Sequence, residues 1–146
     1  ERNGIKYEIN SQIPFTGVAT VYYKNGQLMS KLTYKDGKQN GLAESYYDNG
    51  QLEFKGNWKG GKLNGIFEGY RENGQLEFKD TYKDGKLNGL ARMYYENGQL
   101  MIKVTYKDGK LNGIFESYDE NGQEEDWSPV CYQNGEDADI SICKSL

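Results

Sequence analysis

An Asn-Gly dipeptide returns every 24 residues along this 146-residue chain. It stands at residues 25–26, 49–50, 73–74, 97–98 and 121–122, and neighbouring units differ by substitution without insertion. A second glycine series has the same period: Gly17, Gly41, Gly65, Gly89 and Gly113. A fixed period of this length is the signature of a repeat array, in which each structural unit packs on the next.

Each unit contains two extended segments separated by turn residues. In the unit 89–112, Leu100, Ile102 and Val104 alternate with Met101 and Lys103, and alternation with a period of two is typical of a β-strand. Asn and Gly tolerate the positive φ that tight hairpin turns require. No segment keeps a helical period over three turns, so each unit is predicted to be a β-hairpin.

Stacked hairpins predict an all-β fold, an elongated single-layer antiparallel β-meander built from tandem 24-residue hairpin repeats. Two strands per unit advance such a sheet by roughly 10 Å per repeat. Three regions follow from the pattern: an N-terminal cap strand and turn (1–16), the tandem repeats (17–122) and a C-terminal capping hairpin (123–146). Within the caps we expect a lone strand at 5–9, a turn at 133–135 and a final closing strand near 139–143.

The two faces of the predicted sheet are expected to differ, one serving for packing between repeats and the other for binding a partner. If Asp48-Asn49-Gly50 forms a three-residue loop with a left-handed glycine, Tyr46 lies opposite Leu52. The recurring rings and aliphatic side chains are then expected to form a packing face: Tyr46, Leu52, Phe54, Trp58, Tyr70, Leu76, Phe78, Tyr82, Tyr94 and Tyr118. The opposite side varies between repeats and uses residue types enriched at interfaces. We predict that a partner binds there, through Tyr47, Phe67, Arg71, Met93, Tyr95 and Phe115. The packing face is a rival site, because a single layer leaves part of its apolar stripe uncovered.

The charge pattern limits the classes of partner. The chain has 18 basic and 22 acidic residues mixed along its length, with a net charge of −4. We see no basic stripe, so nucleic acid is not expected as a partner. Lys31, Lys55, Lys79 and Lys103 form a ladder about 10 Å apart, which Glu53 and Glu77 are expected to offset. A membrane surface is therefore a weak candidate, and no apolar run approaches the ~20 residues of a membrane helix.

Catalytic chemistry is not expected. The chain has no His, which removes the commonest general base and most metal motifs. No glycine-rich segment carries the Gly-Lys-Ser/Thr ending of a phosphate-binding loop, and acidic runs such as 124–126 are better explained as solvated surface. We therefore predict a protein that is not an enzyme and holds no cofactor or metal. Cys131 and Cys143 can form a disulfide in an oxidising compartment, with two ordinary buried thiols as the alternative.

At this point a family resemblance is evident. The segment 54–65, with Phe54, Gly56, Trp58, Gly61 and Gly65, resembles the MORN repeat (membrane occupation and recognition nexus). YYENGQL and YKDGKLNG are more similar to the bacterial variant of that repeat, which is associated with the YwqK-like antitoxin family. The resemblance covers residues 13–122 and implies the stacked-hairpin fold. It also implies roles as a scaffold, a lipid-associated module or a targeting segment.

The favoured hypothesis is a bacterial protein-binding repeat module, of the antitoxin or immunity type. The alternatives are a secreted or lipid-anchored envelope scaffold or adhesion protein, and a membrane-associating MORN module. The chain begins with Glu1 instead of Met, so we expect a preceding segment, for which a signal peptide is a candidate. The cell envelope, periplasm or extracellular space is accordingly favoured over the cytoplasm.

Overall fold

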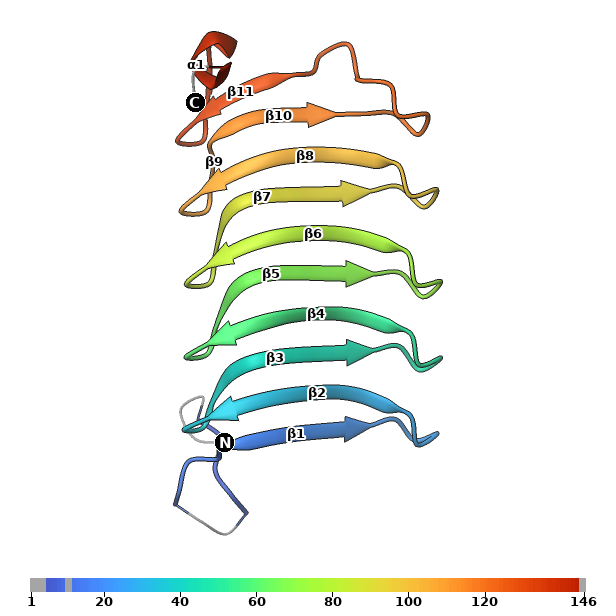
Figure 1. Cartoon of the computed structure of the whole chain (residues 1–146), viewed down its shortest axis with the longest axis vertical. Helices are drawn as coiled ribbons and strands as arrows, with labels where there is room; N and C mark the ends of the chain where they lie inside the picture. The colour runs from blue at the N-terminus through green and yellow to red at the C-terminus, as the bar shows by residue number, and fades with distance from the viewer. Residues whose placement is uncertain (1–4, 10–11, 145–146) are drawn as a thin grey trace.

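The computed structural model describes residues 5–9 and 12–144 and consists of one open antiparallel sheet with a single short helix in the described part (Figure 1). Strands follow one another in chain order across the sheet, and β9 pairs only with β8. The elements are β1 (Gly17–Tyr22), β2 (Leu28–Lys35), β3 (Lys38–Tyr46), β4 (Leu52–Lys59), β5 (Lys62–Tyr70), β6 (Leu76–Lys83), β7 (Lys86–Tyr94), β8 (Leu100–Lys107), β9 (Lys110–Leu111), β10 (Gly113–Ser117), β11 (Val130–Gln133), β12 (Glu136–Ala138) and α1 (Ile140–Lys144). The predicted fold class, a single-layer meander of tandem hairpins, is confirmed.

Turn chemistry sets the strand boundaries and also links one repeat to the next. Gly50 has a φ of 87°, as the predicted left-handed loop requires. In the same turn the side chain of Asn49 accepts a hydrogen bond from the backbone amide of Gln51 (2.8 Å) and donates one to the carbonyl of Glu72 in the next repeat (3.1 Å). Asn25 and Asn97 donate equivalent bonds to the carbonyls of Asp48 and Glu120. In these three turns the asparagine therefore shapes its own turn and also joins adjacent hairpins.

The register within the hairpins contains a β-bulge that the sequence pattern does not predict. Tyr46 pairs with Leu52, as predicted, but Ser45 already pairs with Phe54, so the strand carrying Glu53 has one extra residue. The same irregularity separates Gly69 from Tyr70 in the next hairpin. Because an extra residue reverses the alternation of side chains, Tyr46 and Phe54 lie on opposite sides of the sheet.

The predicted division into two faces is therefore wrong. Side chains paired directly across antiparallel strands share a face, and Phe67 pairs with Gly56 while Gly69 pairs with both Phe54 and Phe78. One side, which we name the aromatic face, carries Phe54, Trp58, Phe67, Phe78, Tyr82, Met93 and Phe115. The other side, the ladder face, carries Tyr46, Tyr70, Tyr94 and Tyr118 with the lysine ladder. Three predicted partner-binding residues thus share a face with four predicted packing residues.

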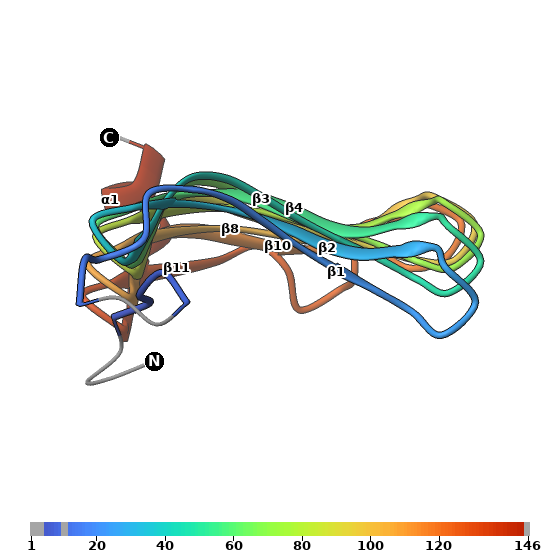
Figure 2. The same ribbon diagram turned by 90° about the horizontal axis from the view of Figure 1, so that it is seen from below.

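The two ends of the sheet are covered on opposite sides (Figure 2). The N-terminal segment lies against the aromatic face, where Phe15 packs on Tyr34 at 5.9 Å between ring centroids. The strand predicted at residues 5–9 is not formed. This segment makes only isolated β-bridges, such as the one between Tyr7 and Pro14. At the other end the predicted turn at 133–135 is present between β11 and β12, but 139–143 is not a strand. The helix α1 occupies that stretch on the ladder face, where Cys143 is bonded to Cys131.

Candidate functional site

The aromatic face is organised around Phe67 in the middle of the array. Its ring lies 5.4 Å from Phe78, 5.7 Å from Phe54, and 6.1 Å from both Trp58 and Tyr82. The geometries range from tilted to edge-on, which are the arrangements that aromatic quadrupoles favour. All five side chains remain half-buried, because a single-layer sheet places no second layer over them. This surface is therefore both the core of the protein and an accessible apolar stripe.

Small residues opposite the rings make this packing possible. A methyl group added at Gly69 would overlap the ring of Phe78, and one added at Gly56 would meet Phe67 at 2.8 Å. Asp80 lies among these groups, between Phe67 and Ala91 on the adjacent strands. Burial raises the pKa of the Asp80 carboxyl, and a hydrogen bond from the Arg92 backbone opposes that shift. The aromatic face thus offers rings, shallow steps at the glycines, and a carboxylate.

On the C-terminal side of this cluster, the aromatic face carries Met93 on β7 and Phe115 on β10. Met93 is 46% exposed. Phe115 packs at 5.7 Å on Trp127, which belongs to the connection between β10 and β11, and at 6.3 Å on Tyr132. Together with the N-terminal segment over Tyr34, this connection bounds the aromatic face at both ends of the array (Figure 2).

The remaining predicted binding residues, Tyr47, Arg71 and Tyr95, lie at the Asn-Gly turns and link neighbouring repeats. The hydroxyl groups of Tyr47 and Tyr95 each donate to the backbone carbonyl of the residue 23 positions later, Tyr70 and Tyr118, at 2.9 Å. Arg71 occupies the same position in its repeat and donates from Nη2 to the carbonyl of Tyr94 (2.8 Å), while Nη1 bonds Glu77. These contacts give the three residues a structural role, which the comparison between repeats did not reveal because Arg replaces Tyr at residue 71.

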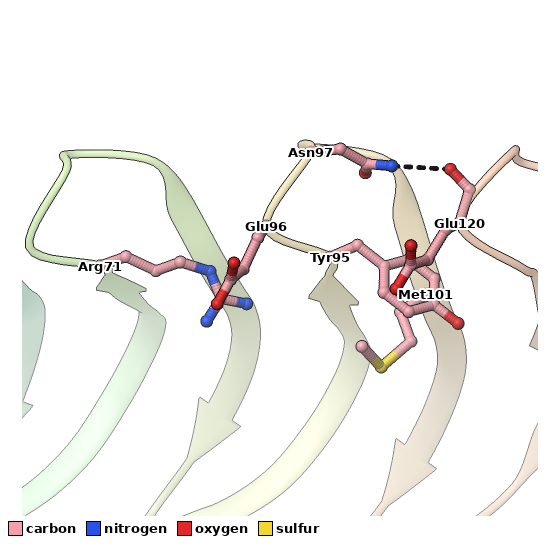
Figure 3. Close-up of a pocket in the computed structure, with 6 residues that line it drawn as sticks. All are labelled: Arg71, Tyr95, Glu96, Asn97, Met101 and Glu120. Atoms are coloured by element: carbon pink, nitrogen blue, oxygen red, sulfur yellow. Dashed lines mark hydrogen bonds between the residues drawn. The ribbon is translucent and has the colours of Figure 1, made fainter.

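Arg71 and Tyr95 also border an open depression at this edge of the sheet (Figure 3). Its lining residues are Arg71, Tyr95, Glu96, Asn97, Met101 and Glu120. The side chains of Arg71 and Tyr95 are engaged with backbone carbonyls, and Asn97 is bonded to the carbonyl of Glu120 (2.7 Å). The side chains of Arg71, Tyr95 and Asn97 thus already link neighbouring repeats, and we assign the depression no ligand.

The ladder face has a row of charged residues that crosses every central strand. Successive neighbours in register are Lys31, Glu44, Lys55, Glu68, Lys79, Arg92, Lys103 and Glu116. Glu68 bridges Lys55 (2.9 Å) and Lys79 (2.8 Å), and Lys103 bonds Glu116 at 2.7 Å. The lysine ladder is thus offset by carboxylates on the alternate strands. Glu53 and Glu77, expected to offset it, instead bond Ser45 and Arg71.

Glu68 is the most strongly perturbed carboxyl of this row. Its side chain is only 11% exposed, and burial raises its pKa. Hydrogen bonds from Lys79, Lys55 and Tyr70 outweigh burial and bring the pKa down from 4.5 to about 2. A carboxyl with a depressed pKa stabilises the folded state above its unfolded pKa, and this stability is lost as pH falls through the folded value.

Replacing Glu68 with Gln is expected to destabilise the protein by about 1.5 kcal/mol at pH 7, an estimate reduced for screening at the partly exposed lysines. The difference between E68Q and wild type should shrink between about pH 4.5 and pH 2, where the wild-type carboxylate becomes protonated. Urea denaturation at a series of pH values measures this. A difference that stays constant down to pH 2 would contradict the assignment.

Lysines gather at the edge formed by the turns between repeats. Lys35 pairs with Lys38, and equivalent pairs repeat along the array. The eight exposed lysines of this lysine edge are Lys35, Lys38, Lys59, Lys62, Lys83, Lys86, Lys107 and Lys110. The expectation that the chain has no basic stripe is therefore wrong, because charges mixed in sequence are sorted by the hairpin period. The opposite edge carries exposed acids instead: Asp48, Glu72, Glu96 and Glu120.

The described residues hold no cluster of three or more His, Cys, Asp or Glu side chains arranged to bind a metal. Within the same residues no helix is long and apolar enough to cross a membrane. Open sheets of stacked hairpins with two broad faces define a class of repeat protein in which partner surfaces are built from successive units.

The MORN repeat variant model matches residues 15–36, 39–59, 63–84, 87–108 and 111–123, which is more than half of the chain. The chain belongs to this family, whose repeats are generally protein- or membrane-interaction modules. No curated protein is significantly similar to the chain.

Proposed function

We propose that the protein is a non-enzymatic protein-binding module that engages its partner through the aromatic face. The observation that carries the proposal is the half-exposed cluster around Phe67, flanked by Met93 and bounded at both ends by the caps. Aromatic side chains and Met are enriched at the centres of protein interfaces. In its finer form, the proposal is a bacterial antitoxin or immunity protein that covers the active surface of a toxin encoded next to it.

Met93→Asp provides a sharp test, because this side chain is 46% exposed and its loss leaves the ring cluster intact. Coexpressed with the product of the adjacent gene, wild type should copurify with that product, and M93D should lose at least tenfold in affinity. The matched control is Leu42→Asp, at a residue 43% exposed on the ladder face. Equal losses in M93D and L42D, or no copurification of wild type, would reject the proposal.

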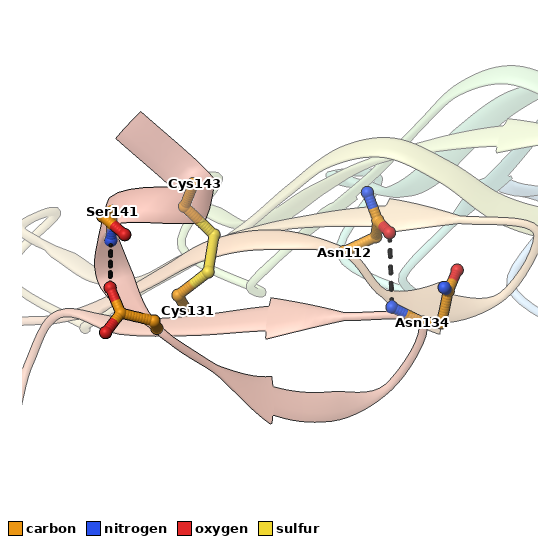
Figure 4. Close-up of a disulfide and its surroundings, with 6 residues drawn as sticks. Asn112, Cys131, Asn134, Ser141 and Cys143 are labelled. Atoms are coloured by element: carbon orange, nitrogen blue, oxygen red, sulfur yellow. Dashed lines mark hydrogen bonds between the residues drawn. A yellow bond between two sulfur atoms is a disulfide. The ribbon is translucent and has the colours of Figure 1, made fainter. Parts of the chain in front are cut away.

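The disulfide supports a second candidate, a secreted or lipid-anchored envelope scaffold. Cys131 and Cys143 are bonded (Figure 4), and such bonds persist in oxidising compartments such as the periplasm and the extracellular space. A scaffold of this kind would use the array as a spacer or an adhesion surface. Protein isolated from its native source under non-reducing conditions should not react with maleimide at either cysteine, and rapid labelling of both would argue against this candidate.

The lysine edge supports a third candidate, a membrane-associating module held at an anionic surface. Asp36, Asp84 and Asp108 lie within the same turns and reduce its positive field. This candidate therefore ranks below the other two.

A further inference from the structure

The charged row of the ladder face departs from its own pattern at one residue. The equivalent position in successive repeats holds Thr20, Glu44, Glu68, Arg92 and Glu116. From Lys31 onward, cations therefore alternate with carboxylates across the strands until Arg92 replaces a glutamate. Lys79, Arg92 and Lys103 stand side by side on β6, β7 and β8.

Glu68 shows what a complete unit of the ladder looks like. Its carboxylate accepts hydrogen bonds from Lys55, Lys79 and the hydroxyl of Tyr70, which lies two residues further along the same strand. Glu116 has the equivalent arrangement, with Lys103 at 2.7 Å and the Tyr118 hydroxyl at 3.2 Å. Each unit is thus a carboxylate surrounded by lysine and tyrosine donors.

At Arg92 the donors are present and the carboxylate is missing. Among the residues that the structure describes, the Arg92 guanidinium makes no ion pair, and Tyr94 has Arg92 where Tyr70 has Glu68. Lys79 and Lys103 turn to Glu68 and Glu116 on their outer sides. Like charges directly opposite each other destabilise a sheet, and no ion pair with another described residue compensates Arg92.

We infer that Arg92 is the centre of a recognition site for a carboxylate side chain of a protein partner. An Asp or Glu of the partner would complete the ladder from outside, accepting from the Arg92 guanidinium, the Tyr94 hydroxyl and the flanking lysines. Charge complementarity favours this occupant, because a carboxylate fills the equivalent position in three other repeats. The guanidinium also presents its donors in a fork that matches a carboxylate.

This site shares with the proposed function only the premise of a protein partner. It lies on the ladder face, whereas Met93 lies on the aromatic face. The partner's carboxylate and the partner's apolar contacts are therefore tested by different variants.

Arg92→Glu repairs the ladder and removes the proposed site at the same time. Binding of a hexaglutamate peptide, followed by NMR through the side-chain Nε–Hε signal of Arg92 and the backbone amides of β6 to β8, should be saturable in wild type. In R92E the apparent Kd from the backbone amides should rise at least about tenfold, as expected for loss of a charged donor. The melting temperature of R92E should meanwhile rise by about 3 °C, because the row regains its alternation.

Lys83→Glu is the matched control, since it makes the same change in net charge at an exposed residue of the lysine edge. K83E should keep the wild-type Kd within about twofold, as additivity predicts for a charge outside the site. M93D should also bind hexaglutamate like wild type, which separates this inference from the aromatic face. The neutral variant Arg92→Gln should also weaken hexaglutamate binding. It removes the guanidinium without adding a carboxylate, so repulsion from a new acid cannot explain the loss.

Unchanged hexaglutamate binding in both R92E and R92Q would overturn the inference. So would a lower melting temperature for R92E, because the three adjacent cations would then not be a cost to the fold. If inorganic phosphate, but not hexaglutamate, shifts the Arg92 signal, the site recognises a phosphate group, and a carboxylate partner is rejected.

Discussion

Replacement of Phe67 with Ala is expected to lower the free energy of unfolding by about 3 kcal/mol, the low end for a Phe→Ala change because the ring is only half-buried. Phe67 contacts rings on the two strands beside its own: Phe54 and Trp58 on β4, and Phe78 and Tyr82 on β6. The positions paired directly with Phe67 are Gly56 and Asp80, which offer no apolar side chain to replace the lost ring. Urea denaturation monitored by tryptophan fluorescence measures the loss, and Trp58 lies within the affected cluster.

Leu42→Ala is the control for this change. Leu42 is 43% exposed on the ladder face, and its loss is expected to cost less than about 0.5 kcal/mol. In a repeat array stability resides in each unit and its interfaces with its neighbours. Amide exchange in F67A should therefore accelerate most in β4, β5 and β6, while β1 and β10 keep their protection. Equal destabilisation by F67A and L42A would show that the aromatic cluster is not the core.

The strands of this protein and their order could be predicted from local sequence patterns. Gly50 and its equivalents adopt the positive φ that their turns require, and the alternation of Leu100, Ile102 and Val104 defines a strand. The pairing of Tyr46 with Leu52 followed from the loop length alone and is confirmed. Local rules of this kind suffice because each hairpin contacts only its neighbours.

The assignment of faces could not be obtained in the same way. A β-bulge beside Glu53 adds one residue to a strand without any glycine or proline to mark it, and one residue is enough to exchange the two faces. A weaker signal was available in the sequence: Gly56 and Gly69 are strand residues without a turn role, which indicates close approach of another group. In the structure that group is an aromatic ring in each case, Phe67 over Gly56 and Phe78 over Gly69.

The surfaces proposed to bind a partner could be predicted from the sequence only in part. Phe67, Met93 and Phe115 were expected to contact a partner and do lie on a partly exposed surface, but they share it with Phe54 and Phe78. The lysine edge was missed because Lys35 and Lys59 are far apart in sequence and become neighbours only when hairpins stack. Arg92 was missed for a related reason, because its neighbours Lys79 and Lys103 come from the adjacent strands.

Removal of the disulfide is expected to release the C-terminal cap while leaving the repeats folded. The bond closes a loop with a sequence separation of 12 between Cys131 and Cys143, and loops of this size contribute about 2–3 kcal/mol. The five-residue helix α1 contacts β10 and β11, and a helix this short does not persist without such tertiary support. Cys143 is its buried residue, so the bond is the main anchor of α1 to the sheet.

The double variant C131S/C143S should therefore lose amide protection across 130–143. Each 2 kcal/mol lost from the free energy of local opening should make amide exchange about 30-fold faster. Protection around Phe67 should remain as in wild type, because unfolding of a terminal unit need not spread through the array. Reduction of wild type with dithiothreitol is the matched control, because it breaks the disulfide without substituting either cysteine. If reduced protein and the double variant both retain full protection in β11 and β12, then hydrogen bonds such as Asn134 to Asn112 (3.3 Å) hold the cap without the bond. If exchange instead accelerates equally in all strands, the chain unfolds as one cooperative unit, and the repeat-by-repeat account of its stability is wrong.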